Sequence, residues 1–299
     1  MDGVLNVNKP GGITSHDVVD GVRRILSIRR VGHAGSLDPM ATGVLLVCVG
    51  QATRIAEYLM SGEKEYEGEM TLGVTTDTED SSGAVTAEAD ASAVTAEQVV
   101  GILPRFTGRI QQAPPMVSAA HHDGRRLYEL AREGRSVARK ARDVEVTQLG
   151  MLEFEPGERP RARLRVVCSK GVYIRTLFAA IGSALGVGAH MSRLTRTRIG
   201  KFVLENSSDL DNLALVAEQG KVADVMIPMA DALSDLPRFD ATQDVAEAVR
   251  HGRSLPAPSA FESGTDSPIR IMDGGELLAL ARITDLHGRL SLQPTKVFV

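Results

Sequence analysis

The stretch Gly32–Gly50, GHAGSLDPMATGVLLVCVG, joins a loop of small residues to an apolar run. The run from Val44 to Val49 is too short for an exposed helix, so it predicts a buried strand. Asp38 stands in the loop, and Pro39 favours an extended backbone at that position. The small residues beside Asp38 leave room for a bulky partner to approach closely. An Asp-Pro pair alone most often marks a turn or a helix cap, so the role of Asp38 depends on the rest of the chain.

The segments on either side of this stretch predict an α+β fold around a mixed, mostly antiparallel sheet. Strands and helices mix without the regular rhythm of a parallel sheet. Ser15 is the predicted N-cap of the first helix, because apolar residues follow it at helical spacing. Strands are expected at 3–9, 44–49, 64–74, 143–154, 161–168 and 194–204, and helices at 15–26, 51–60, 95–103, 124–134 and 173–185.

The composition predicts a two-domain cytoplasmic protein. A chain of 299 residues with 43% hydrophobic residues can bury a sizeable core. After about residue 220 the sequence turns to one helix and two or three short strands, so we expect a large domain over 1–225 and a small β-rich domain over 226–299. No run is long enough for a membrane helix, and the N-terminus lacks the layout of a secretory signal. Cys48 and Cys168 are predicted to be buried reduced thiols, and the histidines show no metal-ligand spacing.

The charge is unevenly distributed. The formal net charge is -4, yet residues 159–201 hold ten Lys and Arg and no acid. Such a basic stretch inside an acidic protein predicts a patch that faces the phosphates of a polyanion. The alternative is a solvated strand face balanced by acids elsewhere in the fold. Residues 77–90 are acidic and rich in turn residues, and we expect there a surface hairpin or loop that would repel a polyanion.

Three further side chains suit a common site with Asp38. Tyr66 lies in a strand that alternates by period two, and Tyr173 and Arg175 stand at the start of a helix. Taken singly, each fits a core aromatic or a surface charge. Together they suit a pocket for an unstacked base, in which aromatic faces stack on the base, the carboxylate attacks and the arginine keeps that carboxylate ionised.

Five motifs carry a family resemblance from about Leu5 to Leu204. In order and spacing the chain closely resembles the TruB family, the bacterial tRNA pseudouridine-55 synthases, and its C-terminal strands resemble the small PUA-type RNA-binding domain of such proteins. The motifs are NKPGGITSHDVV, RRVGHAGSLDPMATGVLLVCVGQATR, KEYEGEMTLGVTTDTEDSSG, GRRLYELAREGRSV and CSKGVYIRTLFAAIGSALGVGAHMSRLTRTRIGKF.

The resemblance implies an enzyme that isomerises one uridine in the T-loop of tRNA to pseudouridine. It implies a pseudouridine synthase fold over 1–225, a PUA-like domain over 226–299, and no metal, nucleotide or organic cofactor. Asp38 falls on the catalytic aspartate of the family. The implied substrate-binding residues are Tyr66, which stacks on the flipped uridine, Arg175, which pairs with the aspartate, Tyr173 as the second pocket tyrosine, His33 beside the displaced base, Lys9 of the first motif and Leu194 of the pocket wall.

The sequence leaves the path of the reaction open. An ordinary Asp pKa of about 3.9 makes Asp38 an ionised nucleophile near neutral pH. It could attack C1′ of the ribose, stabilise the cation formed there, or add to C6 of the base, and the family resemblance adds a glycal path with loss of a C2′ proton. Hydrolytic glycosidases typically use two carboxylates, whereas one is placed here, which favours isomerisation over base release.

The chain departs from the family pattern at two positions, and two rival functions stay open. Val117 and His121 stand where the family usually has Tyr and Lys, which puts the RNA contact of that segment in doubt. One rival is a non-catalytic tRNA-binding and folding chaperone, and another is a guide-directed synthase acting on a different RNA. We expect a monomer that binds the T-stem-loop of tRNA without a membrane or a protein partner.

Overall fold

A single mixed sheet organises the large domain. The computed structural model describes residues 1–118, 120–122, 124–258, 261, 267–286 and 289–298. In this part of the chain the main path of the sheet runs β1 (Gly3–Lys9), β3 (Thr42–Val49), β12 (Ala189–Ile199), β4 (Lys64–Leu72), β11 (Arg161–Cys168), β10 (Arg142–Glu155) and β7 (Gly108–Gln112), with β2 (Val31–Ala34) beside β3 and β13 (Phe202–Val203) beside β12. All of these neighbours pair antiparallel except β3 and β12, which run parallel. The predicted α+β class and mostly antiparallel sheet are therefore confirmed.

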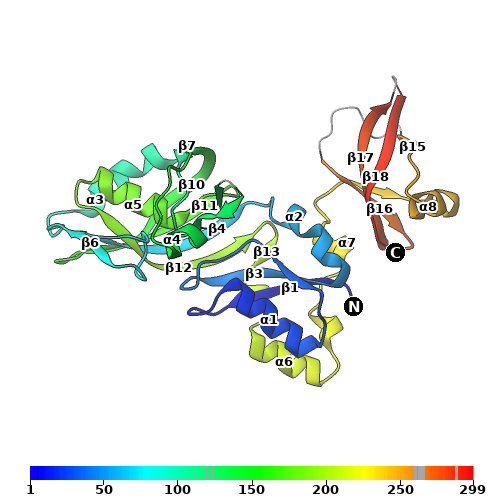
Figure 1. Cartoon of the computed structure of the whole chain (residues 1–299), viewed down its shortest axis with the longest axis horizontal. Coiled ribbons are helices and arrows are strands. Elements are labelled where there is room, and N and C mark those ends of the chain that lie inside the picture. Colours follow the sequence, from blue (N-terminus) through cyan, green and yellow to red (C-terminus); the bar gives the residue numbers. More distant parts are fainter. Residues whose placement is uncertain (119, 123, 259–260, 262–266, 287–288, 299) are drawn as a thin grey trace.

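Helices pack on this sheet in two groups (Figure 1). Near the N-terminal strand, α1 (Ser15–Leu26) contacts α6 (Leu210–Glu218) and β2. Farther along the sheet, α5 (Ile174–Ala184) packs on β12 and β4, and α3 (Ala96–Ile102) packs on β10. The remaining short elements are α2 (Ala56–Leu59), α4 (Leu127–Arg132), α7 (Met229–Ala232), β5 (Val74–Thr76), β6 (Val85–Glu88), β8 (His121–His122) and β9 (Arg125–Arg126).

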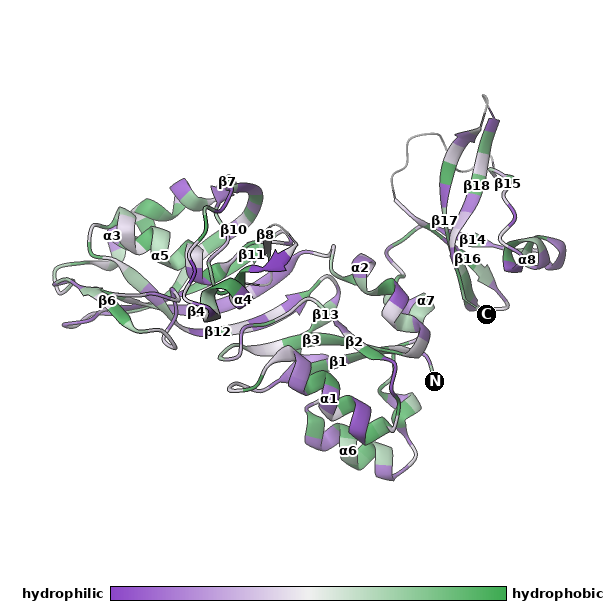
Figure 2. Ribbon diagram, viewed as in Figure 1, coloured by the Kyte–Doolittle hydropathy of each residue, from purple (hydrophilic) through white to green (hydrophobic). Residues whose placement is uncertain are grey.

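Strand β3 is apolar throughout because both of its faces are buried. Val44, Leu46 and Cys48 join one hydrophobic cluster, whereas the alternate residues Leu45 and Val47 join the cluster under α1. A strand buried on both faces is expected to read as a continuous apolar run. Figure 2 colours the residues of β3 by this apolar character. The buried strand predicted after Asp38 is confirmed, and Cys48 and Cys168 are both buried and free.

Several boundaries differ from the sequence prediction. Thr14, not Ser15, is the N-cap of α1, where it forms a capping box with Asp17. The helix expected at 51–60 is a 3-10 segment, Gly50–Ile55, followed by the short α2. The strand expected at 194–204 begins at Ala189, ends at Ile199 and resumes briefly as β13. Propensity and periodicity do not fix such ends, which depend on the hydrogen bonds that tertiary neighbours offer.

The C-terminal part forms a separate five-stranded sheet. Its order is β14 (Arg238–Asp240), β16 (Ile269–Asp273), β17 (Glu276–Leu286), β18 (Arg289–Val297) and β15 (Leu255–Pro256), accompanied by α8 (Gln243–Arg250). The predicted division at 225/226 falls at the start of a connecting segment that still packs on the large domain, since Ile227 bridges Val4 of β1. None of the described helices has both the length and the apolar composition needed to cross a membrane.

Gly68 of β4 tests the packing of α5 on the sheet. A Cβ at Gly68 would lie 2.8 Å from the Phe178 ring of α5, whereas a Cβ at Gly150 of β10 would meet nothing within 4 Å. We predict that Gly68→Ala lowers the free energy of unfolding by about 1–3 kcal/mol, as overpacking in a core does. The matched control Gly150→Ala should stay near wild type in the same urea titration. Equal effects of the two substitutions would contradict this packing.

Candidate active site

The Asp38 loop connects β2 to β3 and is held by side chains from three other elements. Ser15 of α1 accepts a hydrogen bond from the Leu37 N–H at 2.9 Å and lies 3.2 Å from the Leu37 carbonyl oxygen. Lys9 of β1 donates to the carbonyls of Pro39 at 3.0 Å and Ala41 at 2.7 Å. Because these bonds fix the backbone on both sides of Asp38, the carboxylate is presented in one position. Ser15 thus serves the loop instead of capping the helix.

Lys9 is fully buried beneath this loop. Its ammonium group also donates to the Pro10 carbonyl, so all three of its donors are used by backbone oxygens. Burial lowers the pKa of Lys9 to about 8, against the opposing effect of Asp38. The resemblance implied a substrate-binding residue, but the structure gives Lys9 no exposed surface. Its place fits the positioning of the Asp38 loop.

Gly35 at the start of the Asp38 loop and Gly43 just after it, in β3, occupy positions where the backbone requires glycine. Gly35 has φ +93° and Gly43 has φ +102°, a region that favours glycine. A Cβ at Gly43 would lie 2.2 Å from the Arg196 carbonyl oxygen across the parallel contact of β3 with β12. The sequence suggested that the small residues provide clearance for a bulky partner. Gly35 is one of those small residues, and its positive φ gives it a reason in backbone conformation, whereas Gly43 lies in β3 and permits the close approach of β12.

Arg175 lies between two carboxylates. Its guanidinium is 3.2 Å from Asp38 and 3.4 Å from Asp80, and it donates to the Val117 carbonyl at 2.6 Å. The Arg175 side chain is 3% exposed and that of Asp80 is 4% exposed, whereas 33% of the Asp38 side chain remains accessible. The pairing of Arg175 with Asp38 agrees with the sequence prediction. Asp38 is the member of this group that a substrate can reach.

Asp80 is a site residue that the sequence reasoning missed. Residues 77–90 were expected to form an acidic surface segment, and β5 with β6 does form a hairpin there. Asp80, however, turns inward and accepts hydrogen bonds from Thr78 Oγ1 at 2.8 Å and the Ser82 N–H at 2.9 Å. The expectation of a repelling acidic surface is wrong for this residue, because its charge is buried and paired with Arg175. Its place within the third family motif was the available signal.

Burial raises the pKa of Asp38 above its ordinary value of 3.8. Removal from water is the largest cause, Arg175 opposes it, and the Asp80 charge adds to it, with smaller lowering effects of Lys9 and Arg196. The sequence analysis expected Arg175 to hold Asp38 ionised. In the structure Arg175 is shared with Asp80, so it offsets only part of the effect of burial.

A cluster of aromatic and apolar side chains lies beside the Asp38 loop. Tyr66 on β4 is buried, which raises the pKa of its phenol and keeps it neutral. Leu194 on β12 and Leu37 beside Asp38 belong to the same hydrophobic cluster as Tyr66. His33 on β2 is half-buried, and burial lowers its pKa, so its imidazole is neutral at pH 7. The structure thus brings Asp38, Arg175, Tyr66 and Leu194 to one region.

Tyr173 is the half-buried N-cap residue of α5, two positions before Arg175. The Gln112 side chain holds its backbone at two points, since it accepts from the Tyr173 N–H at 2.7 Å and donates to the Tyr173 carbonyl at 3.0 Å. Gln112 therefore ties the end of β7 to the start of α5. The sequence reasoning did not single it out, because only the fold brings residues 112 and 173 together.

The basic stretch 159–201 does not form one free patch. Arg175 and Arg196 are buried, and Lys170 and Arg193 are exposed. Most other arginines pair with glutamates of neighbouring strands or loops, as in Arg159 with Glu88, Arg161 with Glu155, Arg163 with Glu153, Arg165 with Glu65, and Arg198 with Glu63 and Glu65. These pairs agree with the alternative of a strand face balanced by acids, and contact of this stretch with phosphates stays a prediction.

Val117 and His121, which depart from the family pattern, are described by the structure to different extents. The Val117 side chain is 40% exposed, while its backbone carbonyl accepts from Arg175. The His121 side chain lies outside the described residues. Among the residues that the structure describes, no group of three His, Cys, Asp or Glu is placed to hold a metal ion.

The site combines a reachable carboxylate, a buried arginine paired with it and a neutral tyrosine nearby, which are groups suited to chemistry on an extruded base. The family profile for the N-terminal domain of TruB family pseudouridylate synthases matches residues 23–174, and that for the C-terminal domain of tRNA pseudouridylate synthase B matches residues 175–234. The chain belongs to the TruB family of pseudouridine synthases.

Individual relatives agree with this assignment. A protein named tRNA pseudouridine synthase B from Symbiobacterium thermophilum is 52% identical over 84% of this chain and 82% of its own length. The protein of the same name from Geobacillus thermodenitrificans is 45% identical over the full length of both chains. A solved H/ACA RNP bound to a substrate RNA containing 2′-deoxyuridine has a chain with a TM-score of 0.75 and 29% identity, over 99% of this chain and 85% of that chain.

The shared arginine leads to a prediction for Asp80. Asp80→Asn removes a buried charge partner of Arg175, and breaking a buried pair costs about 3–5 kcal/mol of stability. It also removes the charge that raises the pKa of Asp38, so the acid limb of the pH–rate profile should move to lower pH. Single-turnover rates across pH and thermal melts measure both effects.

Asp90→Asn is the matched control, because Asp90 is an exposed residue of the same acidic stretch. We expect it to leave the rate and the acid limb at their wild-type values. An Asp80→Asn protein with an unchanged profile would contradict the shared-arginine arrangement.

Proposed function

We propose that this enzyme converts the uridine at position 55, in the T-loop of tRNA, to pseudouridine. The observation that carries the proposal is the reachable carboxylate of Asp38, which Arg175 contacts at 3.2 Å beside the apolar cluster that holds Tyr66 and Leu194. The names of the relatives support tRNA as the substrate. The uridine is flipped out of the loop into this pocket, where stacking on an aromatic side chain stabilises it.

The proposed reaction conserves every atom of the nucleotide. The bond from C1′ to N1 breaks, the uracil turns, and a bond from C1′ to C5 forms, while C5 loses one proton and N1 gains one. Asp38 acts as the nucleophile or as the charge that stabilises the ribose cation. Tyr66 stacks on the base, Tyr173 forms the second pocket aromatic, and His33 lies beside the displaced base as a neutral group. No cofactor is required by this balance.

A binding-only role as a tRNA chaperone explains the site less well. Flipping and releasing a T-loop requires stacking surfaces and cations, but no carboxylate in the pocket. Burial raises the pKa of Asp38 and costs free energy when the carboxylate is ionised. A surface that only binds RNA would gain nothing in return. We further propose that the protein works in the cytoplasm as a monomer without a guide RNA or protein partner, and that the C-terminal sheet is a PUA-like RNA-binding domain.

Asp38→Asn tests the catalytic role. We expect loss of isomerisation at saturating unmodified tRNA, while tRNA affinity persists. Mapping of pseudouridine by mass after incubation with each protein provides the measurement. Turnover that survives near the wild-type rate would refute the proposal.

The same substitution has a predicted effect on stability. Because folding raises the pKa of Asp38, the protonated form stabilises the fold at low pH, and this contribution is lost as the pH rises through the folded pKa. At pH 7.5 the ionised Asp38 therefore costs stability, and Asp38→Asn should melt at a higher temperature than wild type. The difference should shrink toward pH 3. A lower Tm for the variant at pH 7.5 would contradict the direction of this pKa shift.

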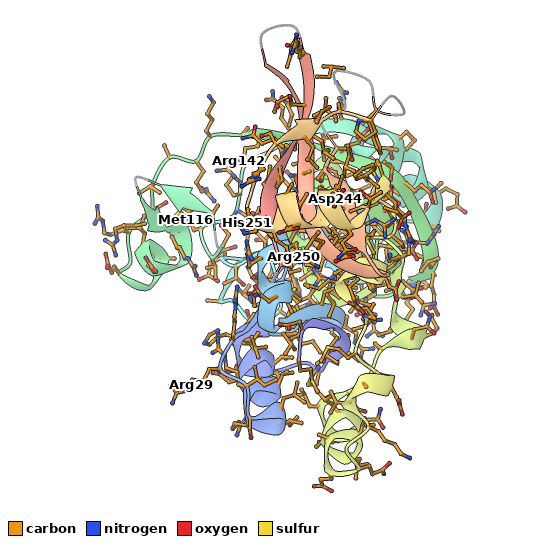
Figure 3. The ribbon with its side chains drawn as sticks, turned by 90° about the vertical axis from the view of Figure 1, so that its right-hand side faces the viewer. Arg29, Met116, Arg142, Asp244, Arg250 and His251 are labelled. Atoms are coloured by element: carbon orange, nitrogen blue, oxygen red, sulfur yellow. The ribbon has the colours of Figure 1, made fainter. Side chains whose placement is uncertain are left out.

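We expect individual exposed cations, and not the basic stretch 159–201 as a whole, to contact the phosphates of tRNA. Lys170 is exposed between β11 and α5, Arg142 is exposed at the start of β10, and Arg29 is exposed in the connection between α1 and β2, where it points away from the ribbon in Figure 3. Lys170→Gln should weaken tRNA binding and reduce the salt slope by about 1. Arg163→Gln is the matched control, since Glu153 already neutralises Arg163, and its affinity and slope should match wild type. The reverse order would sink this assignment.

A further inference from the structure

Arg196 is a buried cation at the centre of the large domain. Its side chain is 1% exposed, which makes it one of the largest fully buried side chains of the described chain. It donates to the carbonyls of Gly35 at 3.0 Å, Ser36 at 3.3 Å and Val44 at 2.8 Å. The first two acceptors belong to the loop that carries Asp38, and the third begins the apolar part of β3.

The strand order places Arg196 between the two halves of the site. Strand β12 lies between β3 and β4 in the sheet. Arg196 is in register with Gly43 of β3 on one side and with Tyr66 of β4 on the other. Asp38 comes from the β2–β3 connection and Tyr66 from β4, so β12 separates the elements that carry them. From this position the Arg196 side chain reaches the Asp38 loop, where it contacts the carbonyls of Gly35 and Ser36.

A guanidinium is suited to this position. Its planar fork presents several donors in fixed directions, so one side chain can hold three carbonyls at once. Together with Lys9, which holds the carbonyls of Pro39 and Ala41, it accounts for backbone oxygens on both sides of Asp38. Lys9 approaches from β1 and Arg196 from β12, so the loop is fixed from two directions.

A buried arginine on carbonyls can also be purely structural, and this chain offers the comparison. Arg270 of β16 donates to the carbonyls of Ala230 at 2.9 Å, Leu236 at 3.0 Å and Ser234 at 3.1 Å. Its acceptors belong to the connecting segment, not to the active site. The number and kind of hydrogen bonds match those of Arg196, but Arg270 is 8% exposed and lies away from the Asp38 loop.

We propose that Arg196 is a positioning residue that sets the Asp38 loop relative to Tyr66, and so aligns the carboxylate with the base stacked in the pocket. The inference rests on the proposed function. It adds a role for a side chain that the sequence analysis counted only as part of the basic stretch. Misplacement of a reacting group by about 1 Å can cost about 10²-fold in rate.

The positive charge of Arg196 should also affect the pKa of Asp38, which a purely structural role in packing would not do. The charged or titratable groups facing Asp38 are Arg175 from α5, Asp80 from the 77–83 loop, Lys9 from β1, Tyr66 from β4 and Arg196 from β12. Arg196, Arg175 and Lys9 lower the pKa of Asp38, whereas Asp80 raises it. Loss of the Arg196 charge should therefore raise that pKa and move the acid limb of the rate profile to higher pH.

The test compares Arg196→Met and Arg196→Lys with the matched controls Arg270→Met and Arg270→Lys in the full chain. Single-turnover rates are measured at saturating unmodified tRNA across pH, at a temperature where thermal melts show each protein folded. We expect Arg196→Met to lose about 10²-fold in rate and to shift its acid limb upward. Arg196→Lys should lose rate but keep the wild-type limb, because it retains the charge and loses the fork. The Arg270 variants should lose thermal stability only.

The outcomes separate this inference from the proposed function. Wild-type rate and pH profile in folded Arg196→Met, or equal changes in the Arg270 variants, would overturn the positioning role. If Arg196→Met does not fold, the rate of Arg196→Lys decides in the same way. If wild type does not isomerise tRNA, the proposed function fails, and hydrogen exchange of amides 35–44 decides the inference. Faster exchange in the Arg196 variants than in the Arg270 variants supports it, and equal exchange overturns it.

Discussion

The site depends on one guanidinium held between two carboxylates. Arg175 contacts Asp38 at 3.2 Å and Asp80 at 3.4 Å, and its own position is fixed by the Val117 carbonyl and by α5. A buried charge is tolerated only when it is paired, so Arg175 offsets part of the cost of burying each acid, although for Asp38 the cost of burial remains the larger effect. Asp80 keeps Arg175 in place and also prevents it from neutralising Asp38 fully. The reachable carboxylate is therefore anchored, desolvated and available for reaction.

The rest of the large domain supports this pair through backbone contacts. The Asp38 loop forms few bonds of its own and is held by Ser15 of α1, Lys9 of β1 and Arg196 of β12. These residues come from segments far apart in the sequence, and the sheet brings them together. Strand β3, buried on both faces, provides the rigid base from which the loop projects. Function at one aspartate thus requires much of the fold.

The sequence predicted the parts of the structure that follow from periodicity and motif. The buried β3 strand, the α+β class and the pairing of Asp38 with Arg175 were all accessible to it, and family comparison confirmed the class of enzyme. Contacts between residues on neighbouring strands could not be predicted from the sequence. Asp80 looked like surface acid and the arginines after Arg159 looked like a free patch, because a linear pattern does not show which glutamate lies on the next strand. Gln112 was missed and Ser15 was given the wrong role, because their partners at residues 173 and 37 are brought close only by the fold.

Asp38 is a desolvated carboxylate that shares its partner Arg175 with Asp80. A ¹³C NMR titration of the Asp38 carboxyl group in the free protein measures this most directly. We expect a pKa above 3.8 in wild type and a lower pKa when Asp80 carries no charge, since burial and the Asp80 charge both raise the pKa of Asp38. A pKa at or below 3.8 in wild type, or one that does not respond to loss of the Asp80 charge, would contradict this expectation.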